Sequence, residues 1–254
     1  MTSLRTIVDR LDALLMPARW TDYAPNGLQV VGPEEVRRVV TGVSAHAELL
    51  ERAAAAGADL VLVHHGLFWN GDRLGVDRVL RRRLGLLFEH DMALAAYHLP
   101  LDAHPVHGNN AGLAAALGAT GWEPAFAHGG APIGVAASFG DGGIGPEELL
   151  ARVRTATGRP DVLAFLDGPE RVRSIGICSG AAAGDLPEAI ALGLDAFLTG
   201  EPAERCMAIA REHGIHFLAA GHHATERLGV QRLGDLLATE LGVEHEYVEV
   251  HNPI

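Results

Sequence analysis

Residues 57–66 read GADLVLVHHG, in which an apolar run ends in two histidines. A continuous apolar run of this length predicts a strand buried on both faces, as in a sheet covered by helices. The preceding residues, HAELLERAAAAGA (46–58), have helical spacing that Gly57 brings to an end. The stretch therefore predicts a helix followed by a buried strand, which is the repeating unit of layered α/β folds.

The same alternation continues along most of the 254 residues. Helical spacing covers residues 4–15, 46–58, 78–91, 109–118, 187–193, 203–214 and 230–242, and apolar runs cover residues 36–44, 59–66, 92–98, 173–180, 195–200 and 215–223. Strands and helices that alternate in this way predict an α/β fold with layered, largely parallel or mixed sheets. Residues 123–146 are rich in Gly, Pro and Ala, so we expect one unit in residues 1–126 and another in residues 127–254.

The two halves are similar in sequence, which predicts an internal duplication. GADLVLVHHG lies over GLDAFLTGE (193–201), and EHDMALAAYH (89–98) lies over EHGIHFLAAGHH (212–223) with a gap of one residue. This register places Gly57 on Gly193, Asp59 on Asp195, His65 on Glu201, His98 on His222 and Asp102 on Glu226. A period of more than 100 residues indicates duplicated domains, because solenoid repeats are much shorter. The alternative is that any two α/β units have a similar order of elements.

Imidazole and carboxylate side chains gather where the predicted strands end. His64 and His65 close one strand, and His98 closes another, with Asp102 in the following loop. His222 closes a third strand, with Glu226 just beyond it. Ligands of open α/β sheets bind beyond the carboxyl ends of the strands. We therefore expect two similar units to bring together around one cavity His64, His65, Asp102, His222 and Glu226, with His98 beside them.

This donor set predicts a metal site without thiolates. Imidazole and carboxylate ligands suit divalent zinc, iron, manganese, nickel or cobalt. Five or six such ligands are more than one tetrahedral ion takes while keeping an open position. We therefore predict two divalent transition-metal ions bridged by a carboxylate, for which Asp102 is the candidate. Neighbouring strand residues point to opposite faces, so His64 and His65 share one ion only if the strand ends there.

The composition argues against several other classes of protein. The formal net charge of −12 repels phosphate backbones and disfavours non-specific nucleic-acid binding. All 20 basic residues are arginine, which excludes a lysine Schiff base and the lysine of a phosphate-binding loop. Cys178 and Cys206 lack CxxC spacing, and no charge-free apolar run approaches the ~18 residues that span a bilayer. We expect a soluble protein of the cytoplasm.

Six stretches of the chain resemble the YbgI-like, or NIF-three-like, family of dinuclear metal proteins. They read DYAPNGLQV (22–30), VVTGV (39–43), GADLVLVHHGLFW (57–69), YHLPLDAHPVHGNN (97–110), LDAFLTGE (194–201) and AAGHHATER (219–227). The combination of VHHGLFW, HLPLDAH…GNN and GHHATER is highly specific, and the resemblance covers nearly the whole chain. Residues 123–172 carry no motif that matches the family.

The resemblance has further implications for the fold, the assembly and the site. It implies two similar, interlaced α/β domains and a ring-shaped homo-hexamer whose active sites face an interior cavity. It implies that the metal ligands are His64, His65, Asp102, His222 and Glu226. Family members are commonly labelled homologues of a second type of GTP cyclohydrolase.

Two functions fit these expectations. The first is a two-metal hydrolase that acts on a small molecule: a nucleotide, another phosphate ester or a cyclic amide. Glu201 is the leading proton-transfer candidate, and His98 is the second candidate or a sixth ligand. The rings of Phe68, Trp69 and Tyr97 either stack on a substrate or pack in the core. The second function is a metal-binding ring scaffold or metal-delivery protein, which needs no open coordination position.

Overall fold

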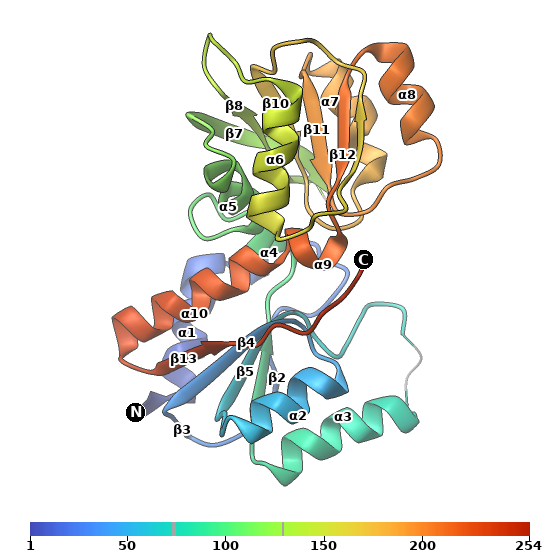
Figure 1. Cartoon of the computed structure of the whole chain (residues 1–254). Helices are drawn as coiled ribbons and strands as arrows, with labels where there is room; N and C mark the ends of the chain where they lie inside the picture. Colours follow the sequence, from blue (N-terminus) through green and yellow to red (C-terminus); the bar gives the residue numbers. More distant parts are fainter. Residues whose placement is uncertain (73–74, 129) are drawn as a thin grey trace. The chain divides into compact units, whose positions relative to one another are not determined.

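The chain folds into two compact units, each built from two segments of the sequence. The computed structural model describes residues 1–72, 75–128 and 130–254. Unit 1 comprises Met1–Leu101 and Gly229–His251, and unit 2 comprises Asp102–Leu228 and Asn252–Ile254 (Figure 1). The chain first passes from unit 1 to unit 2 between Leu101 and Asp102, which is earlier than the boundary expected near residue 126. Most of its C-terminal helix and its last strand belong to unit 1 again.

Unit 1 contains a five-stranded sheet of mixed direction. Four of its strands are parallel to one another, and the edge strand β2 pairs antiparallel with β6. Because β5 and β6 are parallel neighbours, their carboxyl ends lie at the same edge of the sheet. The strand order is β13 (Glu244–Tyr247), β4 (Arg38–Ser44), β5 (Leu60–His65), β6 (Ala93–Ala96) and β2 (Gly27–Val30), and β1 (Thr2–Ser3) pairs separately with β3 (Glu35–Val36).

Helices cover both faces of this sheet, as its apolar strands predict. Leu62 of β5 packs in one hydrophobic cluster with α1 and α10, and its neighbour Val61 packs in another with α2 and α3 (Figure 1). Alternate residues of a strand point to opposite faces, so a strand covered on both sides is apolar throughout. The helices of unit 1 are α1 (Leu4–Leu15), η1 (Pro17–Arg19), α2 (Ala47–Ala55), α3 (Arg78–Glu89) and most of α10 (Arg227–Leu241).

Unit 2 contains a six-stranded mixed sheet. Its central strands β10, β11 and β12 are parallel, and the strands on either side of them are antiparallel. The strand order is β7 (Gly121–His128), β8 (Ala131–Ser138), β10 (Ser174–Ile177), β11 (Ala196–Thr199), β12 (His216–Ala219) and β9 (Leu163–Leu166).

The helices of unit 2 pack on this sheet through buried apolar side chains. Leu113 of α5 and Leu149 of α6 lie in one hydrophobic cluster with Ile175 of the central strand β10. Helix α7 contacts β11, and α8 contacts β12. The bounds are α5 (Asn109–Ala116), α6 (Pro146–Thr157), η2 (Ala183–Asp185), α7 (Leu186–Ala191), α8 (Cys206–His213) and α9 (His222–Thr225), and the one-turn helix α4 (Leu99–Asp102) links the units.

The two sheets have the same strand order over four strands. β4, β5, β6 and β2 follow one another in unit 1 as β10, β11, β12 and β9 do in unit 2, and the last strand is antiparallel in both. Asp59 and Asp195, which the sequence register superposes, also have the same role. The Oδ2 atom of each accepts hydrogen bonds from two successive backbone N–H groups at the start of β4 or β10. This similarity agrees with the predicted duplication, whose common origin stays a prediction.

The sequence pattern predicts no strand in the region where β7 and β8 form a long hairpin. Gly, Pro and Ala are poor strand formers, so the composition of residues 123–146 gives no strand signal. The hairpin instead depends on long-range pairing, because β8 lies antiparallel to β10. The edge strands β2, β9 and β13 are also outside the predicted set.

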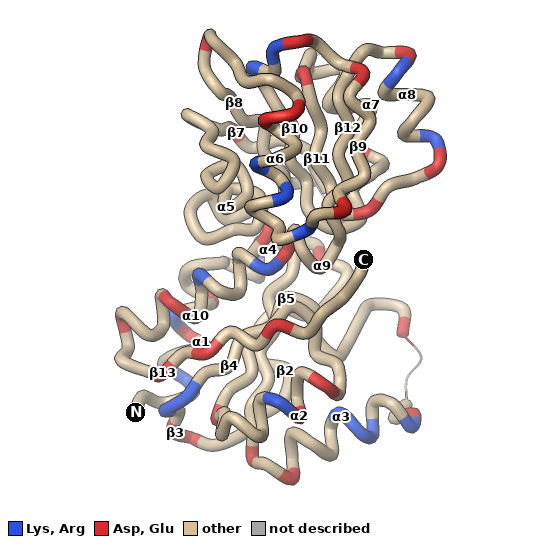
Figure 2. Tube along the Cα trace, viewed as in Figure 1, with Lys and Arg blue, Asp and Glu red and all other residues tan. Residues whose placement is uncertain are grey.

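The structure also shows where the acidic residues lie and whether any helix could cross a membrane. Acidic residues occur along both units (Figure 2). Within the described ranges, no helix combines the length and the apolar character that crossing a membrane requires.

Candidate metal centre

The histidine pair stands at the carboxyl end of β5. His64 is fully buried, and its Nδ1 atom lies 2.9 Å from the carbonyl oxygen of Tyr97. A carbonyl oxygen only accepts hydrogen bonds, so Nδ1 carries the proton and donates it. This fixes the tautomer in which Nε2 carries the lone pair that would bind a metal ion.

His65 lies beside His64 because β5 ends there. The centroids of the two rings are 4.6 Å apart, although neighbouring side chains of a regular strand point to opposite faces. The Nδ1 atom of His65 hydrogen bonds with the hydroxyl of Ser44 on β4, at 3.0 Å. Both histidines are therefore held through Nδ1, which is the arrangement that ligation through Nε2 requires.

His98, which follows β6, is held by a buried carboxylate. Its Nδ1 atom donates to Oδ1 of Asp22 at 2.7 Å, and the Asp22 side chain is 3% exposed. Asp22 also accepts hydrogen bonds from the side chain of Asn26 and from the backbone N–H of Leu99. Burial alone would raise the pKa of Asp22, but His98 and these other donors outweigh it, and the pKa is lowered. Asp22 is thus a stable anion that orients His98.

Together, the three histidines form a cluster that can hold a metal ion. One ring nitrogen each from His64, His65 and His98 lies within 4.8 Å of the others. The indole of Trp69 packs against the cluster, with its centroid 5.6 Å from that of His65 and 5.2 Å from that of His98. This cluster belongs entirely to unit 1.

In unit 2, Asp102 is a buried carboxylate with fixed donors. It is 4% exposed, and its Oδ1 atom accepts hydrogen bonds from Asn109 at 2.8 Å and from the hydroxyl of Ser179 at 3.2 Å. The fully buried Asn110 accepts from the backbone N–H of Ser179 and donates to the carbonyl of Ile133. The GNN motif therefore fixes the loop that carries Asp102 against the end of β10.

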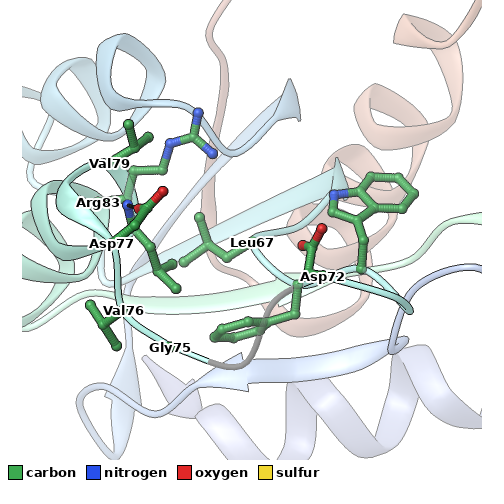
Figure 3. Close-up of a pocket in the computed structure, with 10 residues that line it drawn as sticks. Leu67, Asp72, Gly75, Val76, Asp77, Val79 and Arg83 are labelled. Carbon is green, nitrogen blue, oxygen red and sulfur yellow. Dashed lines mark hydrogen bonds between the residues drawn. The ribbon is translucent and has the colours of Figure 1, made fainter.

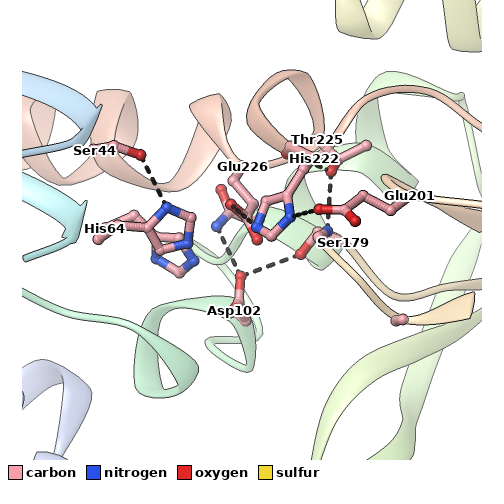
Figure 4. A network of polar contacts seen from close by, with 12 residues as sticks. Ser44, His64, Asp102, Ser179, Glu201, His222, Thr225 and Glu226 are labelled. Carbon is pink, nitrogen blue, oxygen red and sulfur yellow. Dashed lines mark hydrogen bonds and ion pairs between the residues drawn. The ribbon is translucent and has the colours of Figure 1, made fainter. Parts of the chain in front are cut away.

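His222 lies between two carboxylates, one on each side of its ring. Its Nδ1 atom donates to Glu201 at 2.5 Å, and its Nε2 atom lies 3.2 Å from Oε2 of Glu226 (Figure 4). His222 begins helix α9, so Glu226, four residues on, lies on the same side of the turn. Burial alone would lower the pKa of His222, but Glu226 and Glu201 outweigh it and raise the pKa to about 9. The Nε2 edge of the His222 ring, which faces Glu226, is therefore a position that favours a cation. A proton occupies this position when no metal is bound.

A glycine makes room for this position. A Cβ atom on Gly180 would lie 2.4 Å from Oε1 of Glu226 and 3.3 Å from Nε2 of His222. Gly180 also has a φ of +68°, which favours glycine. Its N–H donates to the hydroxyl of Thr225, which in turn donates to the carbonyl of His222. The loop after β10 is therefore shaped around the side chains of α9.

The two buried carboxylates of unit 2 are close neighbours. An oxygen of Asp102 and an oxygen of Glu226 lie within 4.8 Å of each other, and the residues are 4% and 3% exposed. Two carboxylates at this separation repel one another in a buried site unless a proton or a cation compensates the charge. The chemistry of this pair fits a divalent cation.

A cavity of about 710 Å³ in unit 1 is lined by residues that follow the histidine pair. Phe68 and Trp69 contribute aromatic walls, and Leu67 and Arg83 also line it (Figure 3). Tyr97 does not contribute. Its ring is fully buried, and its hydroxyl donates to Asp12 at 2.6 Å. Of the two roles that the sequence left open for Tyr97, the structure supports packing in the core.

Each unit thus gathers its own share of the predicted site residues. Unit 1 brings His64, His65 and His98 together, and unit 2 holds the other predicted site residues, Asp102, Glu201, His222 and Glu226. Sequence reasoning missed the residues that orient these donors or make room for them, namely Asp22, Asn26, Asn109, Asn110, Ser179, Gly180 and Thr225. The resemblance was a sequence signal for five of them, since DYAPNGLQV, GNN and AAGHHATER contain Asp22, Asn26, Asn109, Asn110 and Thr225.

Comparison with known sequences identifies relatives along the whole chain. The family model for Duf34/NIF3 (NGG1p interacting factor 3) matches residues 2–253. A Pseudomonas aeruginosa protein described as "GTP cyclohydrolase 1 type 2 homolog" is 46% identical over 251 residues, which is 99% of this chain and 98% of that protein. An Escherichia coli K12 protein with the same description is 42% identical over 94% of each chain.

Solved structures with the same fold are also found. Protein ybgI, described as of unknown function, superposes with a TM-score of 0.93 and is 38% identical over 100% of both chains. A protein from Thermus thermophilus has a TM-score of 0.87 and is 31% identical over 100% of both chains.

Proposed function

The chain belongs to the DUF34/NIF3 family, and we propose that it is a dinuclear metal protein that acts as a metal-dependent hydrolase. When bound, two divalent ions supply Lewis acidity, which activates water and stabilises the negative charge that develops on a substrate oxygen. The metals that suit these ligands are zinc, iron, manganese, nickel and cobalt. The proposed ligands are His64, His65, Asp102, His222 and Glu226.

The observation that carries this proposal is that the imidazole donors are fixed in the tautomer that binds a metal and that two carboxylates are buried close together. In unit 1, His64 and His65 are held through Nδ1, and in unit 2, Asp102 and Glu226 are buried within 4.8 Å of each other. Buried charges in proteins are paired or coordinate metals. The family resemblance implies that the five proposed ligands together bind the two ions.

We assign proton transfer to His98 in this proposal. The buried carboxylate of Asp22 holds Nδ1, so the other ring nitrogen of His98 is directed to the histidine cluster, where it can accept or release a proton. Glu201 accepts the Nδ1 proton of His222, and this contact supports an orienting role. The predicted proton-transfer role of Glu201 stays a prediction.

We propose a nucleotide, another phosphate ester or a cyclic amide as the substrate. The relatives' description names GTP cyclohydrolase homologues, and aromatic residues lie beside the proposed ligands. Phe68 and Trp69 line the 710 Å³ cavity together with Arg83, whose Nε atom is buried without a hydrogen-bond partner among the described residues. An aromatic wall and a guanidinium suit a flat ring that bears an anionic group.

The test is a comparison of metal-loaded and metal-free protein on a panel of nucleotides, phosphate esters and cyclic amides. We expect turnover only with metal, and its loss in Asp102→Asn. Asp141→Asn, on an exposed loop of the same unit, is the matched control and should keep full activity. If metal-loaded wild type turned over no member of the panel while binding two ions, the scaffold or metal-delivery function would replace the hydrolase.

We further propose the ring-shaped homo-hexamer that the family resemblance implies. Sedimentation equilibrium should give about six times the chain mass of 26.8 kDa. A monomeric or dimeric mass for folded, metal-loaded protein would contradict the ring, whatever its activity.

A further inference from the structure

Three further side chains of metal-ligating type converge in unit 2, and none of them is among the donors described above. His128 ends β7, Cys178 follows β10, and Asp185 ends the short helix η2. One donor atom from each lies within 4.8 Å of the other two. The Nε2 atom of His128 donates to Oδ2 of Asp185 at 2.9 Å. A thiol, an imidazole and a carboxylate from three separate elements therefore face one point.

The thiol is deep, and the other two groups open toward solvent. Cys178 is fully buried, whereas the side chains of His128 and Asp185 are 30% and 14% exposed. Gly134 leaves the β8 side of Cys178 without a side chain, since a Cβ there would lie 3.2 Å from the Cβ of Cys178. The cluster thus has a closed inner end with a sulfur donor and an outer end that an ion can reach.

The chain is distorted close to this cluster. Phe126, two residues before His128, has a φ of +61°, which is uncommon for a residue with a side chain. Its N–H donates to Glu188 of helix α7 at 3.1 Å. Strained residues of this kind persist only where surrounding contacts hold them, and they are frequent at functional sites. The end of β7 is therefore fastened to the segment 183–191 by two carboxylates, those of Asp185 and Glu188.

We propose that Cys178, His128 and Asp185 form a further metal site, for a divalent ion that accepts a thiolate ligand, such as zinc. A Cys, a His and an Asp are three of the four ligands of a tetrahedral zinc site, and water from the exposed side of His128 can supply the fourth. Binding breaks the S–H bond, forms a metal–sulfur bond and releases one proton to solvent. Thiolate and carboxylate then balance the two charges of the ion.

The protonation of the free thiol agrees with this assignment. Burial raises the pKa of Cys178 well above its ordinary value, and the charges of Asp185 and Asp102 raise it further. In the absence of a cation, the thiol is protonated and unreactive. A metal has to displace that proton, so the affinity of the site increases with pH.

Cobalt(II) spectroscopy tests the site directly, because cobalt bound to a thiolate has a charge-transfer absorption in the near ultraviolet that cobalt bound to imidazole and carboxylate lacks. Metal-free wild type saturated with cobalt(II) should develop this band with an intensity that corresponds to one thiolate-bound ion per chain. Cys178→Ser should lose it. Cys206→Ser is the matched control, because Cys206 is also fully buried in unit 2 but is not in the cluster, and it should keep the band.

Two further variants cover the case in which Cys178→Ser fails to fold. His128→Gln and Asp185→Asn change partly exposed side chains, and each should weaken the cobalt affinity measured at this band by about tenfold or more. His222→Ala should keep the band, which separates this site from the proposed centre. A folded wild type without the band, a band that persists in Cys178→Ser, or unchanged affinity in both other variants would overturn the proposal in favour of a plain ion pair.

Discussion

A Cβ atom on Gly180 would stand 2.4 Å from Oε1 of Glu226, so the ligand carboxylate occupies the space that a side chain at this position would need. The backbone of Gly180 leaves β10 in a left-handed conformation, and Glu226 follows helix α9. The two residues come from distant parts of the sequence, and their close approach holds the carboxylate next to His222. Gly180 is therefore as much a part of the candidate centre as the side chains that would bind the metal.

We expect Gly180→Ala to weaken metal binding by about 10- to 100-fold, because the new methyl group displaces Glu226. Isothermal titration calorimetry of metal-free protein measures this change. Gly193→Ala is a matched control, since Gly193 has a φ of +69° but, among the described residues other than its chain neighbours, nothing lies within 4 Å of the position that its Cβ would take. The control carries the same backbone strain and should keep its metal affinity. Equal affinities in the two variants would contradict the account of Gly180.

Metal binding should release a proton from His222. Its pKa of about 9 means that the ring is protonated in metal-free protein at neutral pH, held by Glu226 and Glu201. An arriving cation replaces this proton, so the apparent affinity should increase with pH until about 9. Calorimetry at neutral pH in two buffers of different ionisation enthalpy counts the protons. We expect His222→Ala to release one proton fewer, and an unchanged count would contradict the assignment.

The same ion pairs should stabilise the metal-free protein in a defined pH range. The folded-state pKa of His222 is raised from 6.5 to about 9, so the stabilisation is fully present below 6.5 and is lost as the pH rises through 9. Denaturant unfolding of metal-free wild type and Glu201→Gln should therefore differ most at the lower end of this range. Glu201→Gln should also bind metal about tenfold more weakly, because His222 loses its orienting carboxylate. If the two proteins had the same stability and metal affinity, Glu201 would have no orienting role.

Asp22→Asn should destabilise the protein at neutral pH by about 1–3 kcal/mol, since a buried charge that accepts several hydrogen bonds is lost. The pKa of Asp22 is lowered below 3.8, so its contribution is present above that value and is lost as the pH falls further. The difference between variant and wild type should therefore shrink in acid. Asp9→Asn, at an exposed position, is the control and should stay within about 0.5 kcal/mol of wild type. A similarly small effect for Asp22→Asn would contradict the role of this carboxylate.

The sequence predicts the fold class well because the central strands are apolar throughout. Strands such as β5 and β11 are covered on both faces, and this requirement is visible as runs of Val, Leu, Ala and Phe. Helix ends are also encoded locally. Ser3 accepts from the N–H of Thr6 and begins α1, and Pro146 begins α6.

The hairpin of β7 and β8 could not be predicted in the same way. Its outer strand β7 is largely exposed, so no apolar pattern is required of it. Its Gly, Pro and Ala residues disfavour a strand when they are read locally. Pairing of β8 with β10 makes these residues a strand, and that contact joins parts of the chain about 40 residues apart.

In the candidate site, too, some residues can be recognised from the local sequence, whereas others depend on contacts between distant parts of the chain. The histidines and carboxylates were recognisable because metal-ligating residue types follow predicted strands. Their orienting partners are ordinary Asp, Asn, Ser and Gly residues, whose role depends on contacts far along the chain. Asp22 reaches His98 over 76 positions, and Ser179 reaches Asp102 over 77. No local pattern encodes such contacts, and only the family resemblance pointed to some of these residues.

The most direct test of the central claim is an anomalous-scattering map from crystals of the protein loaded with one transition metal and measured at its absorption edge. The account predicts two strong peaks for each chain, bound by His64, His65, Asp102, His222 and Glu226. A thiolate-accepting metal should give a third, separate peak at Cys178. A map of fully loaded protein with no peak at these five residues, or with a single ion bound by only one unit's donors, would contradict the dinuclear centre.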